Sequence, residues 1–113
     1  MKILIDDQRS ILPDGTLPDV IIRTFTAANN VVLGLGFAYD NPQGLGGMEL
    51  YLDHDLGEEK TGYDFICNLE RELYSISDMG TDLYLPEKIV CVSDNPAGRK
   101  RIQQVIDKLY KRI

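Results

Sequence analysis

The sequence contains no tryptophan, one histidine and two cysteines, which leaves few residues for a zinc or redox site. Cys67 and Cys91 lie in apolar segments without CxxC or Cys/His spacing, so we expect reduced core cysteines rather than a disulfide or a metal site. Reduced cysteines suit the cytoplasm, which is the predicted location. No apolar run approaches the roughly 20 residues that a membrane-spanning helix needs, so we expect no membrane partner.

The sequence also lacks an excess of positive charge. Its 12 lysines and arginines face 18 acids, which gives a formal net charge of −6. Coating of duplex nucleic acid is therefore not expected, because it needs a basic face. Basic residues are nevertheless concentrated from Arg99 onward, where Asp107 is the only acid. This last segment either presents an ordinary solvated helix face or forms a local patch for a phosphate-bearing ligand or partner.

At 113 residues the chain is long enough for one hydrophobic core, and we predict a single domain spanning residues 1–113. The N-terminal stretch MKILIDDQ reaches its first acids after only a few apolar residues, so it predicts a buried strand rather than a signal peptide. Tyr110 and Ile113 are too few apolar residues near the C-terminus to indicate a dimer.

Four short apolar segments predict strands, at residues 2–5, 20–25, 48–52 and 88–92. Helical spacing of apolar residues predicts a brief helix capped by Thr26, a helix over residues 61–76 and a final helix capped by Asn95. The glycine-rich segment 40–47 matches no phosphate-binding spacing, so we assign it no ligand role. This order of elements is typical of an α/β fold with a mostly parallel four-stranded sheet flanked by about three helices.

Polar side chains follow all four predicted strands. The carboxyl ends of parallel strands meet at one sheet edge, so Asp6 or Asp7 is expected to lie beside Asp53. Crowded carboxylates are relieved by taking up a proton or by binding a cation, and oxygen ligands suit Mg²⁺, Mn²⁺ or Ca²⁺ better than zinc. The sequence therefore favours a divalent metal site, and the alternative is a hydrogen-bonded acid cluster that closes the sheet edge.

The stretch LDHDLG brings Asp53, His54 and Asp55 to the end of the third strand. The two-residue period of a strand places both aspartates on one side and His54 on the other. His54 is a candidate general acid, general base or metal ligand, but this alternation favours an orienting or packing role.

Candidate phosphate-binding residues follow the fourth strand. Ser93 offers a hydroxyl, Asn95 begins the last helix, and Arg99 has a guanidinium that suits a phosphate. Helix capping alone also explains Asn95. Arg9 and Arg23 either reach the same site or form ion pairs with its acids.

The ordered segments ILIDDQR, IIRT, YLDHDLG with TGYDF, and VCVSDNPAGRKRI resemble the cyclic-phosphate processing receiver family, an offshoot of the receiver domains of two-component signalling. The resemblance implies a small receiver-like (flavodoxin-like) three-layer α/β fold. It also implies a Mg²⁺ site at Asp6, Asp7 and Asp53, in which Asp53 matches the phospho-accepting aspartate of receivers and Ser93 their hydroxyl residue.

Other residues match or depart from these families. Four residues resemble features of the cyclic-phosphate offshoot, namely His54, Asp55, Asn95 and Arg99. Unlike a receiver, the chain has a loop in place of the first helix, and residues 1–113 provide no fifth strand with its lysine.

Three functional hypotheses follow. The first is a phosphoesterase using Mg²⁺ (or Mn²⁺) that acts on a small nucleotide or on a cyclic-phosphate RNA end. Its catalytic residues would be Asp53, Asp55 and His54, and its phosphate-binding residues Ser93, Asn95, Arg99 and Arg9. In a variant, Asp53 is a nucleophile and Asp55 the acid/base, as in haloacid-dehalogenase-like phosphatases. The second is a non-enzymatic module that binds a phosphorylated ligand or partner, and the third is a phosphorylatable switch.

Overall fold

The computed structural model describes residues 1–36, 44–78 and 85–111. Its strands are β1 (Lys2–Ile5), β2 (Val20–Ile22), β3 (Glu49–Leu52) and β4 (Lys88–Cys91). Its helical segments are α1 (Phe25–Ala28), the π-helical turn η1 (Asn29–Leu33), α2 (Gly34–Gly36), α3 (Gly62–Asp78) and α4 (Pro96–Tyr110). Part of the glycine-rich segment, residues 40–43, lies outside the described residues.

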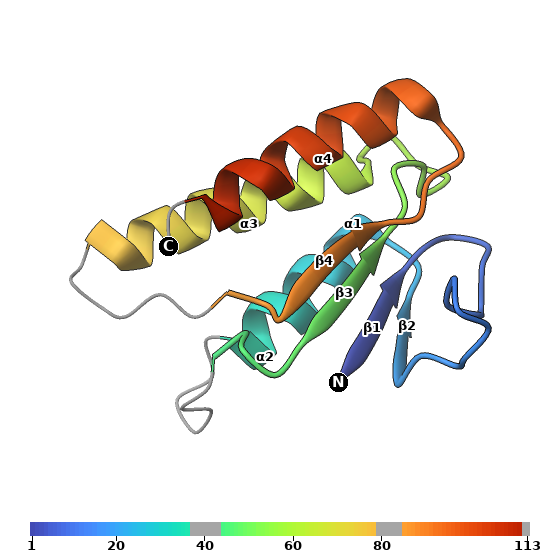
Figure 1. The fold of residues 1–113 in the computed structure, drawn as a ribbon, viewed down its shortest axis with the longest axis horizontal. Helices are drawn as coiled ribbons and strands as arrows, with labels where there is room; N and C mark the ends of the chain where they lie inside the picture. The colour runs from blue at the N-terminus through green and yellow to red at the C-terminus, as the bar shows by residue number, and fades with distance from the viewer. Residues whose placement is uncertain (37–43, 79–84, 112–113) are drawn as a thin grey trace.

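The four strands form one parallel sheet in the order β2-β1-β3-β4 (Figure 1). β1 and β3 are the central strands, and both are almost entirely buried apolar segments. Parallel pairing brings the carboxyl ends of all four strands to one edge. The predicted α/β class with a four-stranded parallel sheet is therefore confirmed.

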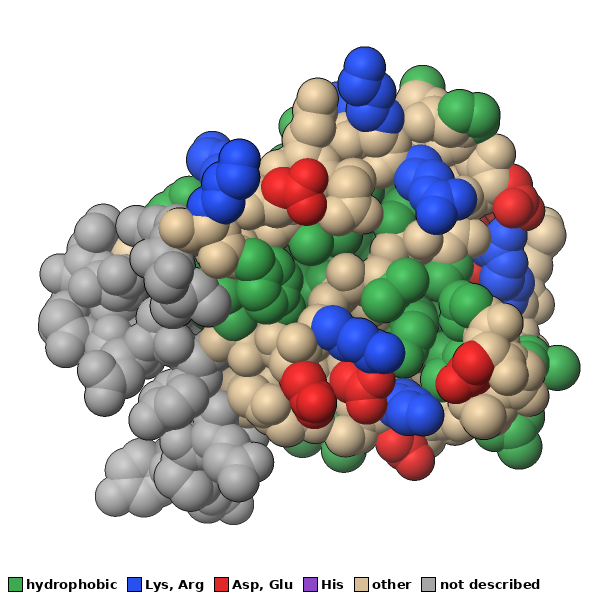
Figure 2. All heavy atoms as spheres, viewed as in Figure 1, with side chains coloured by type: hydrophobic (Ala, Val, Ile, Leu, Met, Phe, Trp, Pro, Cys, Tyr) green, Lys and Arg blue, Asp and Glu red, His purple; other side chains and the backbone are tan. Residues whose placement is uncertain are grey.

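The helices cover a single face of this sheet. Alternate strand residues, such as Ile5 and Leu52, share one core cluster with the buried residues of η1, α3 and α4. The opposite face carries Leu4 and Tyr51, and Leu12 from the loop between β1 and β2 packs on both. The loop between β1 and β2 therefore forms the third layer, on the face opposite the helices. The sequence predicted a loop rather than a helix in this segment. Around it, Figure 2 shows apolar surface bordered by acidic and basic side chains.

Local capping residues set the ends of the helices. Thr61 and Asp64 form a capping box at the start of α3, in which the Thr61 N–H donates to Asp64 Oδ2 at 2.8 Å and the Asp64 N–H to Thr61 Oγ1 at 3.3 Å. The prediction that Thr26 caps the first helix is wrong. Thr24 is the cap, with extended backbone and an Oγ1 that accepts from the Ala27 N–H at 3.1 Å, so β2 ends at Ile22.

Two further sequence predictions concern cysteines and membranes. Cys67 and Cys91 are both free thiols, and Cys91 is buried, which raises its pKa. Within the described ranges, no helix combines the length and apolar character needed to span a bilayer.

Candidate functional site

The carboxyl edge of the sheet carries a hollow of about 410 Å³ that we call the acidic crevice. Its lining comes from the segments after β1, β3 and β4 and consists of Asp6, Asp7, Gln8, Arg9, Asp53, Asp55 and Asp94. Residues that are more than 40 positions apart in the sequence thus meet at the place that the parallel sheet predicts.

Asp6 is completely buried at the start of the crevice. Its Oδ1 accepts from the backbone N–H groups of Gln8 and Arg9 at 2.9 and 3.0 Å, and its Oδ2 accepts from Arg9 Nη1 at 2.9 Å. Burial raises the pKa of Asp6, but these backbone donors and the Arg9 guanidinium outweigh burial, so the net pKa is lowered. Asp6 is therefore held as a carboxylate.

Asp53, at the end of β3, is also buried, and its Oδ1 accepts from the His54 N–H at 2.8 Å. Burial, and next the charge of Asp6, raise its pKa, although Ser93 and Arg9 act in the opposite direction. Ionisation of Asp53 thus costs more free energy in the folded protein than in water. A proton or a cation would relieve this penalty.

The acid cluster fits a divalent metal ion. Asp6, Asp7 and Asp53 each offer one carboxylate oxygen, and these oxygens lie within 4.8 Å of one another. Gly57, at a φ of 69°, leaves room for Asp7, because a Cβ at this position would lie 2.9 Å from Asp7 Oδ2. An all-oxygen set of this kind suits Mg²⁺ or Mn²⁺. Among residues 1–36, 44–78 and 85–111, no other group of acids converges in this way.

His54 and Asp55 follow Asp53 but point differently. His54 Nδ1 lies 3.1 Å from Asp55 Oδ1, and Asp55 lines the acidic crevice. The His54 ring packs against Gly98 in the first turn of α4, where an added Cβ would lie 2.4 Å from the ring carbon Cγ. The histidine thus lies between β3 and α4, as the strand alternation predicts for an orienting or packing residue.

Ser93 and Asn95 both make local contacts after β4. Ser93 is buried, its Oγ accepts from the Asn95 N–H at 3.1 Å, and its hydroxyl lowers the pKa of Asp53. Asn95 Oδ1 accepts from the Gly98 N–H at 3.1 Å, which makes it the N-cap of α4. Ser93 therefore reaches the acid cluster, whereas the Asn95 side chain is occupied by capping.

A family model for the cyclic-phosphate processing receiver domain matches residues 1–108. The chain belongs to this family. No curated protein and no solved structure matches the chain. The resemblance based on the sequence segments is therefore confirmed, and the cyclic-phosphate processing receiver fold explains why the acids of β1 and β3 meet at one edge.

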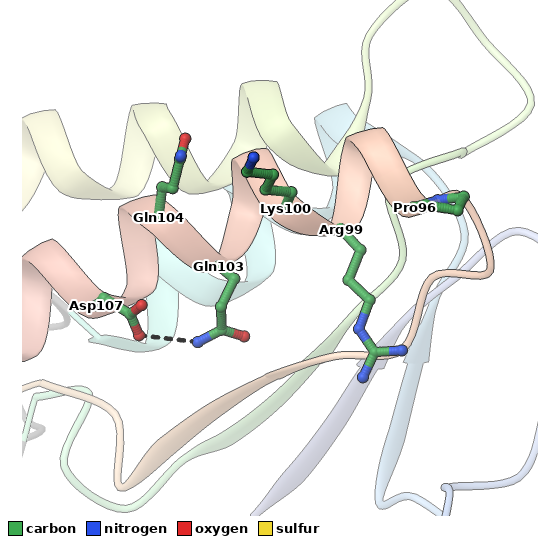
Figure 3. Close-up of a pocket in the computed structure, with 6 residues that line it drawn as sticks. All are labelled: Pro96, Arg99, Lys100, Gln103, Gln104 and Asp107. Atoms are coloured by element: carbon green, nitrogen blue, oxygen red, sulfur yellow. Dashed lines mark hydrogen bonds between the residues drawn. The ribbon is translucent and has the colours of Figure 1, made fainter.

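Arg99 lies beside this receiver-like edge rather than inside the acid cluster. It is exposed on the first turns of α4, and it lines two hollows. One contains Arg9, Ser93 and Asp94, and the other runs along α4 past Lys100 and Gln103, as Figure 3 shows. Its guanidinium extends away from the helix (Figure 3), and the residue is exposed.

The two arginines near β1 and β2 differ in role. Arg9 contacts the acids directly, as the ion-pair alternative predicted. Arg23 Nη1 instead donates to the carbonyl oxygens of Arg9 and Asp6, at 2.7 and 3.2 Å, and so fixes the loop after β1. The sequence interpretation assigned no role to Asp94, whose Oδ2 lies 2.6 Å from Arg9 Nη2. Its position three residues after the end of β4, among the polar residues that follow the strand, was the available signal.

Proposed function

We propose that this cyclic-phosphate processing receiver domain binds and hydrolyses a cyclic phosphate on a nucleotide or an RNA end, with Mg²⁺ or Mn²⁺ as cofactor. The observation that carries the proposal is the convergence of Asp6, Asp7 and Asp53 within 4.8 Å, in a chain of this family. These three residues would hold the metal ion. When bound, it would polarise the phosphoryl oxygens and offset their negative charge.

The phosphate would lie where the crevice meets the neighbouring hollow. Arg9 lines both spaces, and Ser93 and Arg99 line the hollow. Two guanidinium groups that reach one space suit a phosphate, because a planar guanidinium binds two phosphate oxygens through paired N–H donors. Asn95 would contribute by fixing the start of α4, since its side-chain oxygen already caps the helix.

Proton transfer would fall to Asp55 with support from His54. Hydrolysis of a cyclic phosphodiester adds water to phosphorus and breaks one ring P–O bond, which leaves a monoester and a free hydroxyl. Asp55 is exposed in the crevice and can accept the water proton, while its contact with His54 Nδ1 at 3.1 Å orients the carboxylate. Asp53 is a poor candidate for this role if it holds the metal, because coordination occupies its lone pairs.

A first experiment separates metal binding from turnover. Mg²⁺ and Mn²⁺ are titrated calorimetrically into the wild type, Asp53→Asn and the matched control Asp107→Asn, which removes one exposed acid from α4. Cyclic nucleotides and a short RNA with a 2′,3′-cyclic phosphate end are then added, and hydrolysis is followed by ³¹P NMR. We expect binding and turnover in the wild type and the control, and neither in Asp53→Asn. Metal-independent hydrolysis, or equal activity of Asp53→Asn, would contradict the proposal.

The second candidate is a module that binds a phosphorylated ligand without turnover. Two observations favour this function. The Arg9 guanidinium contacts three carboxylates, and the Asn95 side-chain oxygen caps α4, so both groups already have partners within the protein. Saturable binding of the cyclic nucleotides, with no product after prolonged incubation with metal, would select this function.

A further inference from the structure

One guanidinium group connects three carboxylates in the acidic crevice. Arg9 Nη1 lies 2.9 Å from Asp6 Oδ2 and 3.5 Å from Asp53 Oδ2, and Arg9 Nη2 lies 2.6 Å from Asp94 Oδ2. These acids follow three different strands, β1, β3 and β4. Arg9 thus offsets the negative charge of the cluster.

Arg9 contacts the same oxygens that a metal ion would need. Asp6 Oδ1 already accepts two backbone N–H groups, and Asp53 Oδ1 accepts the N–H of His54. The Oδ2 atoms of both aspartates remain, and both face Arg9 Nη1. An ion coordinated by these two oxygens at about 2.1 Å would have to occupy space next to a positively charged nitrogen. Metal and guanidinium therefore compete for one position.

Arg9 is also free to leave this position. Its side chain is 34% exposed, and the Asp94 side chain that it contacts is 93% exposed, so the contact with Asp94 opens without crossing packed side chains. Outward movement does break the ion pair with buried Asp6, and a metal ion at the cluster would replace that lost positive charge. The hollow beside the crevice already includes Arg9, together with Ser93 and Arg99. A displaced guanidinium would thus remain next to the residues proposed to bind phosphate.

We infer that Arg9 is a tethered counter-cation that a divalent metal ion displaces from the acid cluster and that then turns to the phosphate. This inference rests on the metal site of the proposed function, but not on hydrolysis. Metal binding and phosphate binding become linked, because the ion that occupies the cluster releases an anion-binding group. By reciprocity, a phosphate that holds Arg9 outside the cluster tightens metal binding.

A purely structural role for Arg9 makes a different prediction. If the arginine only ties β1, β3 and β4 together, its replacement lowers stability and loosens the acid cluster, so metal affinity stays constant or falls. If Arg9 instead competes with the metal ion, its replacement raises the metal affinity. The two roles therefore differ in the sign of the change in metal affinity.

The test is calorimetric titration of Mn²⁺ and Mg²⁺ into wild type, Arg9→Gln, Arg9→Lys and Lys100→Gln. Arg9→Gln should bind metal about tenfold more tightly, which corresponds to about 1.4 kcal/mol and to the loss of a charge-assisted contact. Arg9→Lys keeps the charge but not the fork of donors, so its affinity should lie between wild type and Arg9→Gln. Lys100→Gln, which removes an exposed charge on α4, should stay within about twofold of wild type.

Side-chain NMR provides a readout that is independent of affinity. With ¹⁵N-labelled arginine, the Arg9 signal, assigned by its absence in Arg9→Lys, should shift when Mg²⁺ is added, and shift again with inorganic phosphate. Circular dichroism of each variant verifies folding.

Several outcomes would overturn the inference. The first is metal binding by Arg9→Gln that is unchanged or weaker than in wild type. The second is an equal change in metal affinity in Arg9→Gln and Lys100→Gln. The third is an Arg9 NMR signal that does not shift when Mg²⁺ is added. Absence of metal binding in wild type and Arg9→Gln alike would overturn both this inference and the proposed metal dependence. Competition between Arg9 and metal without any cyclic-phosphate binding would support the inference and refute the proposed function.

Discussion

Replacement of Gly62 by alanine tests whether the start of α3 fixes the position of Asp53. The Gly62 N–H donates to the His54 carbonyl oxygen at 2.8 Å, so α3 begins in direct contact with the end of β3. A Cβ at residue 62 would lie 1.9 Å from the Asp53 carbonyl oxygen and 2.9 Å from its carbon. Such atoms are backbone and cannot rotate away, so the helix would have to retreat by more than 1 Å.

The expected loss of stability follows from these contacts. Overpacking costs about 1–3 kcal/mol, and breaking the Gly62 hydrogen bond costs about 1 kcal/mol. The better helix propensity of alanine returns at most about 1 kcal/mol. We therefore expect Gly62→Ala to lower the free energy of unfolding by about 2 kcal/mol, and to weaken Mn²⁺ binding because Asp53 moves.

A matched control exists on the same face of the sheet. Gly34 is exposed and helical, with φ −62° and ψ −45°, and an added Cβ would meet nothing within 4 Å. Gly34→Ala should therefore raise the free energy of unfolding by about 0.5–1 kcal/mol. Urea denaturation of both variants measures the difference. If Gly62→Ala is as stable as Gly34→Ala and binds Mn²⁺ like wild type, the reasoning about this contact is wrong.

Three further predictions concern caps, packing and pH. Asn95→Ala should cost about 1 kcal/mol in urea denaturation, because the Gly98 N–H loses its acceptor, and Asn95→Asp should restore most of it. Gly98→Ala should shift the NMR signals of His54, since the ring must rotate away from the new methyl group; unchanged signals would contradict the packing. The pKa of Asp6 is lowered from 3.8 in the folded state, so its contribution to stability is complete well above pH 3.8 and is lost as the pH falls through the folded pKa. Asp6→Asn should flatten this acid limb of the stability curve, whereas a curve of unchanged slope would argue against the contacts of Asp6.

Asp53 is expected to act in the opposite direction on the pH curve. Its pKa is raised in the folded state, so protonation of Asp53 favours folding, and this stability is lost as the pH rises through the folded pKa. The two aspartates thus contribute opposite pH dependences to the stability, although they lie in one crevice. The difference arises because Asp6 accepts two backbone N–H groups and an arginine, whereas Asp53 is buried next to the charge of Asp6.

The sequence by itself determined the features that depend on a few neighbouring residues. Buried apolar runs that end in acids defined β1 and β3, and parallel pairing then required Asp6 and Asp53 to share an edge. The capping box at Thr61 and the cap at Asn95 were also predictable, because each cap bonds to a backbone N–H within three residues. Thr24 and Thr26 are both suitable N-cap residues by local sequence, and only the point at which β2 ends selects Thr24 as the cap of α1.

The tertiary structure decided which side chains meet across the crevice. Arg9 was equally compatible with a phosphate or with the acids, and only the fold brings Asp94, 85 residues away, within reach of its second nitrogen. The packing of His54 on Gly98 likewise requires α4 to cross the end of β3. The direction of a side chain beyond a strand end depends on loops and on distant partners. Local periodicity contains no information about either, so the charge balance of the site is a property of the folded chain.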